Sequence, residues 1–250
     1  TAEVNGNKIT IDGTSQIKAT TLSGNGVITI DAANMTEGAA PIVGNASNFT
    51  GTIELINNDR LVAEIDENGN VILKTKPVAE VNGVKYEDLQ AAINAAQNGA
   101  TVTLLADIDV GTGNALIRGK EITIDLNGHN ITGTGYRVLF VDLLASENKD
   151  GKLTLVGNGT VENTGTTSGN SYAVYVGGNS ELVVETGATV KSANGYAVFV
   201  APMGAGRVSK LTVNGGTVTG RYAVSGSGQL TDTSTVITVN SGAVIGTEVG

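Results

Sequence analysis

The tripeptide Tyr-Ala-Val occurs three times in the second half of the chain, at residues 172–174, 196–198 and 222–224. A longer series of apolar triplets, most of them with a central threonine, begins at residues 102, 122, 153, 182, 211 and 237, which gives steps of 20, 31, 29, 29 and 26 residues. Repeats of about 20 to 50 residues that contain strands and turns are typical of solenoids. The series therefore predicts a backbone that returns to an equivalent position once per coil.

Each repeat also has internal corners. A glycine precedes a valine shortly after the triplets, as in the segments that end at Val161, Val190, Val218 and Val244. With 35 glycines and only 16% charged residues, the composition is that of strands and turns. Three short strands per coil, separated by glycine corners and polar loops, indicate an all-β fold, a parallel β-helix (solenoid), with rungs about 4.8 Å apart.

A single amphipathic helix is expected before the first coil, at about residues 87–97. The apolar residues Leu89, Ala92, Ile93 and Ala96 follow helical spacing, and Glu87 and Asp88 stand where the helix dipole favours acids. Such a helix is placed to cover the open end of the solenoid and its unpaired strand edge.

The segment VAEVNGVKYEDLQAAINAAQNGATVTLLADI, followed by EITIDLNGHNITGTG, resembles the start of pectin-lyase-like β-helix domains in large bacterial cell-surface proteins, which are often described as adhesin-like. The resemblance covers residues 78–250. It implies a right-handed parallel β-helix with an N-terminal helical cap in an exported protein, and it implies no single activity, because this fold serves many functions.

Residues 1–77 are expected to form a small β module or terminal β-helix coils. Asn68-Gly69 lies between two alternating apolar runs and predicts a hairpin turn. Lys76-Pro77 is the predicted boundary before the capped β-helix of residues 78–250. The last coil stops without a capping helix, so we expect either a longer natural polypeptide or a final loop that covers the coil.

The formal charge of −9 disfavours nucleic acid and anionic membranes as partners, because the 15 basic residues are scattered singly. The sequence has no apolar run long enough for membrane insertion. We expect an extracellular or cell-surface location, with the signal and the anchor outside this chain. The expected partner is an extracellular glycan or a protein of a host or neighbouring cell, in an oligomeric state that the pattern does not define.

Polysaccharide-degrading β-helix enzymes place carboxylates on neighbouring rungs. The triplet alignment puts Asp125 and Glu185 in one column but separates them by the Val156 rung, roughly 9 to 10 Å. The Gly128-His129-Asn130 segment resembles the Gly-His-Gly of polygalacturonase-like hydrolases, yet the aspartate pair and the Arg-x-Lys of that family are missing. We assign no catalytic residue.

Asp107 and Asp109 alternate on one face of a short predicted strand and are the candidates for a Ca²⁺ site. A polar rim beside the cap explains both residues better, so the sequence assigns no cofactor and no metal.

The third strand of each coil offers a candidate ligand-binding surface. If the valine face of that strand packs inward, alternation places Leu139, Tyr175 and Phe199 outward on three successive coils. Aromatic rings suit sugar rings, and apolar patches tend to be functional. The alternative is that the insertions at 142–151 and 201–209 fold over this row.

Together these patterns favour a non-enzymatic structural or adhesion module of a bacterial exported surface protein. A carbohydrate-binding or polysaccharide-degrading (lyase or hydrolase) β-helix protein is the alternative, so enzymatic activity stays an open but less favoured hypothesis.

Overall fold

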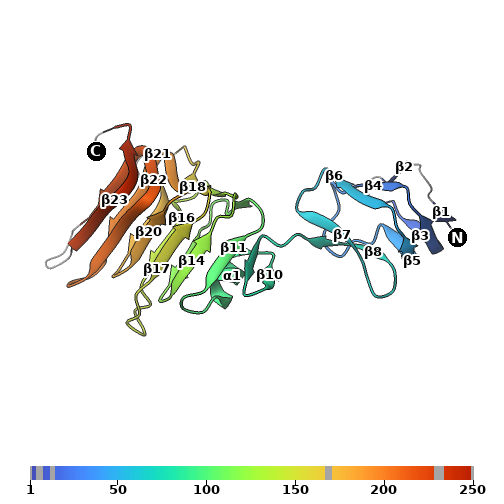
Figure 1. The fold of residues 1–250 in the computed structure, drawn as a ribbon, viewed down its shortest axis with the longest axis horizontal. Helices are drawn as coiled ribbons and strands as arrows, with labels where there is room; N and C mark the ends of the chain where they lie inside the picture. Colours follow the sequence, from blue (N-terminus) through green and yellow to red (C-terminus); the bar gives the residue numbers. More distant parts are fainter. Residues whose placement is uncertain (1, 4–7, 12–14, 167–170, 228–233, 249–250) are drawn as a thin grey trace. The chain divides into compact units, whose positions relative to one another are not determined.

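The computed structural model describes residues 2–3, 8–11, 15–166, 171–227 and 234–248. The chain is an all-β parallel β-solenoid of about eight turns (Figure 1). It divides into two compact units, Thr1–Lys76 and Pro77–Gly250.

The first unit consists of short β-helix coils that end in a hairpin. Its strands are β1 (Ala2–Glu3), β2 (Lys8–Ile11), β3 (Ile17–Gly24), β4 (Val27–Asp31), β5 (Ile42–Phe49), β6 (Thr52–Ile56), β7 (Leu61–Ile65) and β8 (Val71–Thr75). Strands β2, β4 and β6 form one parallel sheet, and β1, β3, β5, β8 and β7 form a mixed sheet in which β8 is antiparallel to β5 and β7. Apolar residues between the sheets, among them Ile28, Ile30 and Ile42, are fully buried.

The hairpin of β7 and β8 turns where Asn68-Gly69 predicted it, and its strands are antiparallel. Gly69 has a φ of +79°, which a glycine adopts without strain. The Asp66 carboxylate accepts hydrogen bonds from the backbone N–H groups of Asn68 and Asn70, which closes the turn. A hydrogen bond from the Asn70 side chain is the main cause that lowers the pKa of Asp66.

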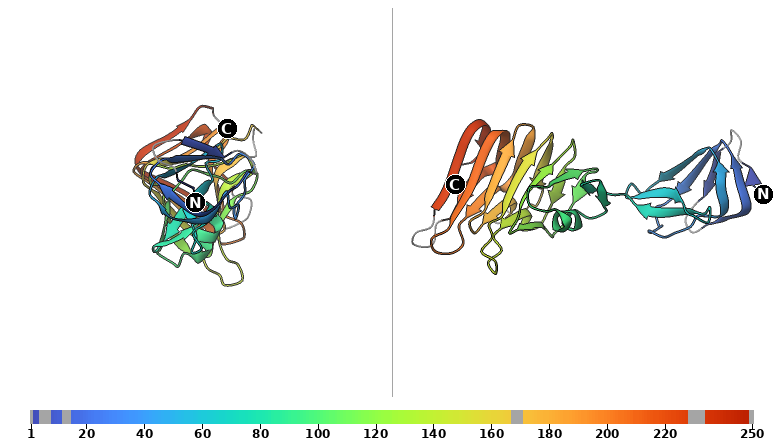
Figure 2. Two further views of the ribbon diagram at one scale, coloured as in Figure 1. Left: turned by 90° about the vertical axis from the view of Figure 1, so that its right-hand side faces the viewer. Right: turned by 60° about the horizontal axis from the view of Figure 1, so that its bottom comes forward.

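The second unit is the capped β-helix, whose strands stack coil upon coil (Figure 2). Its elements are β9 (Ala79–Val81), β10 (Val84–Tyr86), α1 (Leu89–Ala95), β11 (Thr101–Leu104), β12 (Ile108–Asp109), β13 (Ala115–Arg118), β14 (Glu121–Asp125), β15 (Ile131–Gly133), β16 (Arg137–Asp142), β17 (Lys152–Val156), β18 (Gly159–Asn163), β19 (Tyr172–Gly177), β20 (Glu181–Glu185), β21 (Ala188–Ala201), β22 (Val208–Gly226) and β23 (Ser234–Gly246).

Strands of successive coils pair in parallel and form three faces. The first face contains β11, β14, β17 and β20; the second contains β12, β15 and β18; and the third contains β13, β16 and β19. The long strands β21, β22 and β23 continue around corners and so contribute to more than one face. The core of this unit lies between the three faces.

The repeat read from the sequence is confirmed for most coils by the strand register. The triplets align residue for residue through Ile122, Leu153, Leu182, Leu211 and Ile237. The second-face valines align as well, through Val161, Val190, Val218 and Val244. Equivalent apolar residues therefore stack in columns that are buried through Leu211 and Val218, and only the last residues, Ile237 and Val244, are exposed.

The first triplet is an exception, and its predicted alignment is wrong by two residues. Val102 pairs with Ile124 rather than with Ile122, so Thr101, and not the central Thr103 of the triplet, pairs with Thr123. Because a shift of two residues keeps each side chain on the same face, the alternation of the strand allowed both registers.

The cap helix α1 is shorter than the predicted 87–97. Asp88 adopts an extended conformation as the N-cap and accepts a hydrogen bond from the Ala91 N–H, so the helix begins at Leu89. The apolar stripe packs onto the end of the core as expected, with Leu89, Ala92 and Ile93 buried. In the described part of the chain, no helix has the length and apolar character needed to cross a membrane.

Lys120 joins the cap helix to the first complete coil. Its Nζ lies 3.0 Å from the carbonyl oxygens of Ile93 and Ala96 and 3.1 Å from that of Asn94. A lysine favours the C-terminal end of a helix because unpaired carbonyl groups gather there. Partial burial lowers the pKa of this ammonium group.

The substitution Lys120→Met is expected to lower the free energy of unfolding by about 2 kcal/mol, since three charge-assisted hydrogen bonds are lost. Amide hydrogen exchange should accelerate first in Leu89–Ala95. The control is Lys85→Met, which changes an exposed lysine on β10. Equal stability of the two variants in urea would mean that Lys120 does not hold the cap.

Candidate functional site

The third face of the β-helix explains the repeated Tyr-Ala-Val tripeptide. Tyr172, Tyr196 and Tyr222 stand in one register column, and Val174 and Val198 stand in another. The tyrosines lie outside the solenoid, whereas the alanine and the valine of the first two copies both belong to the core. The strand bends at this point and turns two successive residues inward, so a small alanine fits beside the valine.

This bend corrects the predicted outward row. Leu139 pairs with Val174, and Phe140 pairs with Tyr175 and through it with Phe199. Leu139 is a core residue with 0% exposure, and Phe140 takes its place outside. The prediction of an outward Leu139 was wrong, because strict alternation does not hold where Val138 and Leu139 both face inward.

A related tripeptide one coil earlier, Tyr136-Arg137-Val138, is displaced by one residue relative to the three Tyr-Ala-Val copies. Arg137, and not Tyr136, occupies the column of Tyr172. Tyr136 comes just before the strand, and the Tyr172 N–H donates to its carbonyl oxygen at 2.9 Å. The column that contains Tyr172, Tyr196 and Tyr222 therefore has Arg137 at its first position.

Seven aromatic side chains gather on this outer surface, out of the nine (six tyrosines plus three phenylalanines) in the sequence. We name this group the outer aromatic cluster; its members are Tyr136, Phe140, Tyr172, Tyr175, Tyr196, Phe199 and Tyr222. The sequence predicted only Tyr175 and Phe199 of this set as ligand-binding residues. The repeated tyrosine of Tyr-Ala-Val was the signal that could have identified three more.

The rings of the cluster contact one another along the solenoid axis. Tyr196 stacks on Tyr172 with centroids 5.6 Å apart and on Tyr222 with centroids 4.8 Å apart. Tyr175 and Phe199 form a second column, with centroids 5.4 Å apart. Parallel strands set this spacing, because equivalent residues repeat at about the strand separation of 4.8 Å.

Tyr136 covers the inner part of the cluster and is its most accessible ring. It is 51% exposed and meets Tyr172 edge-on, with centroids 5.0 Å apart. Tyr172 and Tyr175 are only 4% and 9% exposed, whereas Tyr196, Phe199 and Tyr222 are half-buried. Burial is the main cause that raises the pKa of Tyr172 and of Tyr175, so both stay neutral phenols near pH 7.

Arg137 is embedded in the cluster. Its guanidinium carbon lies 3.7 Å from the ring centroid of Phe140, 5.4 Å from that of Tyr175 and 5.6 Å from that of Tyr136. Its Nε donates to the Asn114 side-chain oxygen at 3.4 Å. These contacts hold a planar cation at the surface.

Gly177 provides room for the rings at the end of the second column. A β-carbon there would lie 3.2 Å from Phe140 Cε2 and 3.5 Å from Tyr175 Cε1. Glycine thus lets both ring edges approach the backbone.

The insertion at residues 201–209 contacts the cluster through two residues: Ala201 is buried against the rings, and Met203 Sδ accepts a hydrogen bond from the Tyr175 hydroxyl at 3.8 Å. Met203 itself is 52% exposed. The insertion at 142–151 forms its own small bridge between Leu144 and Lys149. Because Tyr136 stays exposed and Tyr196 and Tyr222 stay half-buried, these two insertions leave part of the cluster accessible.

The predicted calcium candidates accept backbone hydrogen bonds, Asp109 within a local turn and Asp107 from the next coil. Asp109 accepts a hydrogen bond from the Gly111 N–H at 2.8 Å, and Asp107 accepts one from the Asn130 N–H at 2.8 Å. Asp107 also lies 3.5 Å from His129 Nδ1. Within the described residues, no group of three or more histidine or acidic side chains could hold a metal ion.

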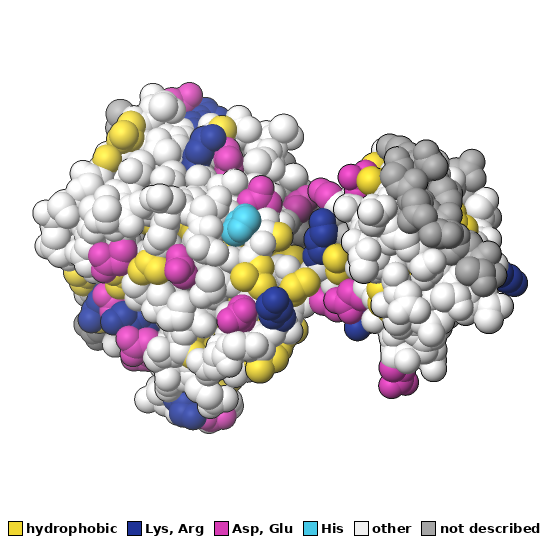
Figure 3. Space-filling view, turned by 45° about the vertical axis from the view of Figure 1, so that its right-hand side comes forward, with side chains coloured by type: hydrophobic (Ala, Val, Ile, Leu, Met, Phe, Trp, Pro, Cys, Tyr) yellow, Lys and Arg dark blue, Asp and Glu magenta, His cyan; other side chains and the backbone are white. Residues whose placement is uncertain are grey.

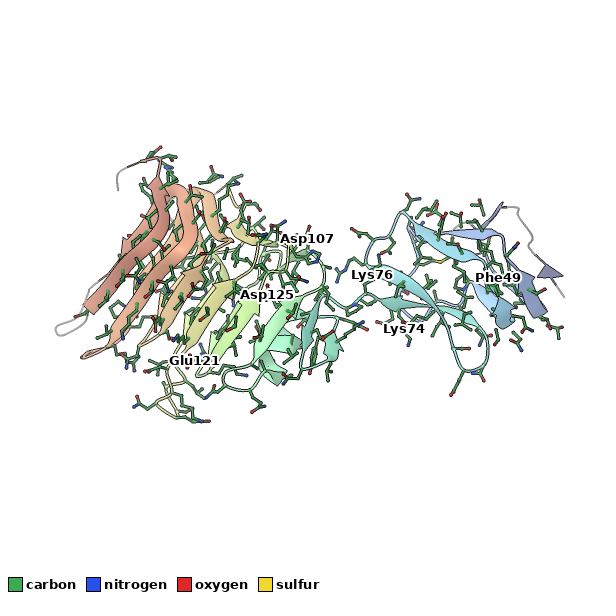
Figure 4. The ribbon with its side chains drawn as sticks, in the orientation of Figure 1. Phe49, Lys74, Lys76, Asp107, Glu121 and Asp125 are labelled. Carbon is green, nitrogen blue, oxygen red and sulfur yellow. The ribbon has the colours of Figure 1, made fainter. Side chains whose placement is uncertain are left out.

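Other carboxylates of the second unit are likewise held by neighbouring groups. Asp125 accepts from the Asn127 N–H, and Glu185 accepts from the Asn214 side chain. Lys152 lies 3.3 Å from Glu121, in a column of the first face. Figure 4 shows Glu121 and Asp125 toward opposite ends of β14, with Asp107 beyond the Asp125 end. On the face shown in Figure 3, acidic and basic side chains of the described residues are interspersed.

The first unit has a hollow of about 590 Å³ beside β6 and β7. Ile53, Leu55 and Val62 contribute to its apolar wall, and Asp59 and Lys76 to its polar one. Its size would suit a small molecule, but one acid and one lysine do not indicate a ligand class.

No protein-family model matches the chain, and neither a curated protein nor a solved structure matches it. The candidate site therefore stands on the geometry of the chain itself, and the outer aromatic cluster is its most distinctive surface.

Proposed function

We propose that this chain is a non-enzymatic adhesion module of an exported bacterial surface protein, and that its outer aromatic cluster binds an extracellular glycan. The assignment to the pectin-lyase-like, adhesin-like class and the location at the cell surface are part of this proposal. The observation that carries it is the concentration of seven of the nine aromatic residues on one outer face.

The physical case for a glycan depends on ring chemistry. Aromatic faces contact the C–H surface of a pyranose ring, and tyrosine adds a hydroxyl that can form hydrogen bonds. Tyr136 is exposed and Tyr196, Phe199 and Tyr222 are half-buried, so the cluster presents a contiguous aromatic surface. Contiguous apolar patches of this kind tend to be interaction sites. The stacked column of Tyr196 and Tyr222 extends along the axis, which suits an extended oligosaccharide better than a compact ligand.

A polysaccharide-degrading enzyme is the competing function. The described carboxylates of Asp107, Asp125 and Glu185 cap turns or join neighbouring coils, which supports the non-enzymatic reading. A glycan array, with and without calcium, followed by incubation with each bound polysaccharide separates the two. Binding without released oligosaccharide supports adhesion, whereas release would establish enzymatic activity.

The alanine variants Tyr196→Ala and Tyr222→Ala are each expected to weaken glycan binding roughly three- to tenfold, as the loss of one ring contact predicts. The matched control is Tyr86→Ala, since Tyr86 is the one tyrosine outside the cluster. Circular dichroism establishes that each variant keeps its β structure. Unchanged glycan affinity in both cluster variants would remove the cluster as the binding surface.

A further inference from the structure

Arg137 differs from the basic residues of the β-helix that form ion pairs, because it lies among aromatic rings. Among the described residues of the β-helix, five Lys or Arg side chains form ion pairs: Arg118 with Asp142 at 3.1 Å, Lys149 with Glu147 at 2.5 Å, Lys152 with Glu121 at 3.3 Å and with Glu181 at 3.9 Å, Lys191 with Glu162 at 2.8 Å, and Arg221 with Glu248 at 2.8 Å. Within the same described residues, Arg137 makes no ion pair. Its polar contact there is with the neutral Asn114 side chain.

The position of Arg137 suits an incoming anion. The guanidinium plane is supported by Phe140 at 3.7 Å, and its Nε is held by Asn114. A half-buried guanidinium that is already oriented loses less conformational entropy when it binds a carboxylate, and it can do so with two parallel hydrogen bonds. The exposed ring of Tyr136 lies beside it, with the guanidinium carbon 5.6 Å from the ring centroid. A sugar ring and a carboxylate could therefore be bound side by side.

The register column that begins at Arg137 limits how many acidic sugars a bound glycan can carry. Arg137 is followed on the next three coils by Tyr172, Tyr196 and Tyr222. A glycan that lies along this column would meet Arg137 first and neutral aromatic rings afterwards. The other cation beside the column, Arg221, lies 5.3 Å from the Tyr222 ring centroid and is already paired with Glu248. A polymer with a carboxylate on every sugar would place its further charges against tyrosines, where they are not neutralised.

We propose that the outer aromatic cluster binds an oligosaccharide that ends in a single carboxylate-bearing sugar, with the carboxylate on Arg137, the ring of that sugar on Tyr136, and the neutral sugars that follow on Tyr196 and Tyr222. This inference rests on the proposed glycan-binding function and names its ligand class.

The test compares three probes by isothermal titration with the whole chain: sialyllactose, lactose and an oligogalacturonate. Sialyllactose carries one terminal acidic sugar, lactose carries none, and the oligogalacturonate carries one on every ring. The expected result is that sialyllactose binds at least about tenfold more tightly than lactose, a difference that one charge-assisted contact supplies and that salt reduces.

The variant Arg137→Gln should reduce the affinity for sialyllactose to that for lactose, and Arg137→Lys should retain part of the difference because it keeps the charge. The control Lys191→Gln removes a basic side chain on the second face and should leave both affinities unchanged.

Two outcomes would overturn the inference while the proposed function stands. Equal affinities for lactose and sialyllactose would show that Arg137 selects no acid, and tighter binding of oligogalacturonate than of sialyllactose would contradict a single acidic subsite. If none of the three probes binds and the glycan array is also negative, the proposed function fails together with the inference.

Discussion

Replacement of Leu139 by alanine is expected to lower the free energy of unfolding by about 2 to 5 kcal/mol, the range for a large buried side chain. Leu139 is fully buried and pairs with Val174 in an inner column of the third face. Packing around it continues through Ala115 on the preceding coil, so the removed methyl groups would leave a cavity inside the solenoid. Urea unfolding of the variant and the parent chain measures the difference.

The matched control for this prediction is Leu116→Ala. Leu116 is half-buried, lies outside the core, and pairs with Phe140 at the edge of the outer aromatic cluster. Its loss should cost about 1 kcal/mol, because less apolar area returns to water. If Leu139→Ala cost no more than Leu116→Ala, Leu139 would lie in the outward row that strict alternation predicted.

The substitution Gly159→Ala is expected to cost about 3 kcal/mol in unfolding free energy, from steric overlap and backbone strain combined. Gly159 has a φ of +151°, and a β-carbon there would lie 2.2 Å from the carbonyl oxygen of His129 and 2.8 Å from Leu126 Cβ. Both neighbours belong to the preceding coil, one of them through its backbone, so neither can move without disturbing the stack. Thermal and urea unfolding should both show the loss.

Gly128→Ala separates the two contributions. Gly128 also has a positive φ, +87°, but a β-carbon there would meet nothing within 4 Å. Only backbone strain of about 1 kcal/mol is expected at this position. Equal losses for Gly128→Ala and Gly159→Ala would mean that close approach between coils contributes nothing at Gly159, and that the corner tolerates a side chain.

The coil repeat was predictable because parallel stacking imposes the same demand on every coil. The columns through Leu153 and Val161 must be apolar, and a corner such as the one at Gly159 has no room for a side chain. Apolar residues and glycines therefore repeat in the sequence once per coil. The cap helix was predictable in its apolar stripe but not in its length. Its start depends on whether Asp88 continues the helix or caps it, and both conformations are consistent with that residue.

The candidate surface was only partly predictable for a different reason. The run Val138-Leu139-Phe140-Val141 is apolar throughout, so no alternation of polar and apolar residues marks which side chain faces outward. A one-residue change of register exchanges Leu139 and Phe140 between core and surface. The sequence consequently placed Tyr175 and Phe199 on the outer side of the strand correctly, but it put the core residue Leu139 beside them.

The sequence by itself determined the fold class, the spacing of the coils and the capping of the first one, because hydrophobic burial and glycine corners repeat along the chain. Only the tertiary structure decided the outer surface. The bend that turns Ala173 and Val174 inward together, and the register that puts Arg137 in the tyrosine column, arise from how neighbouring coils fit. That fit depends on contacts between residues about one coil apart. A local pattern in the sequence does not predict such contacts.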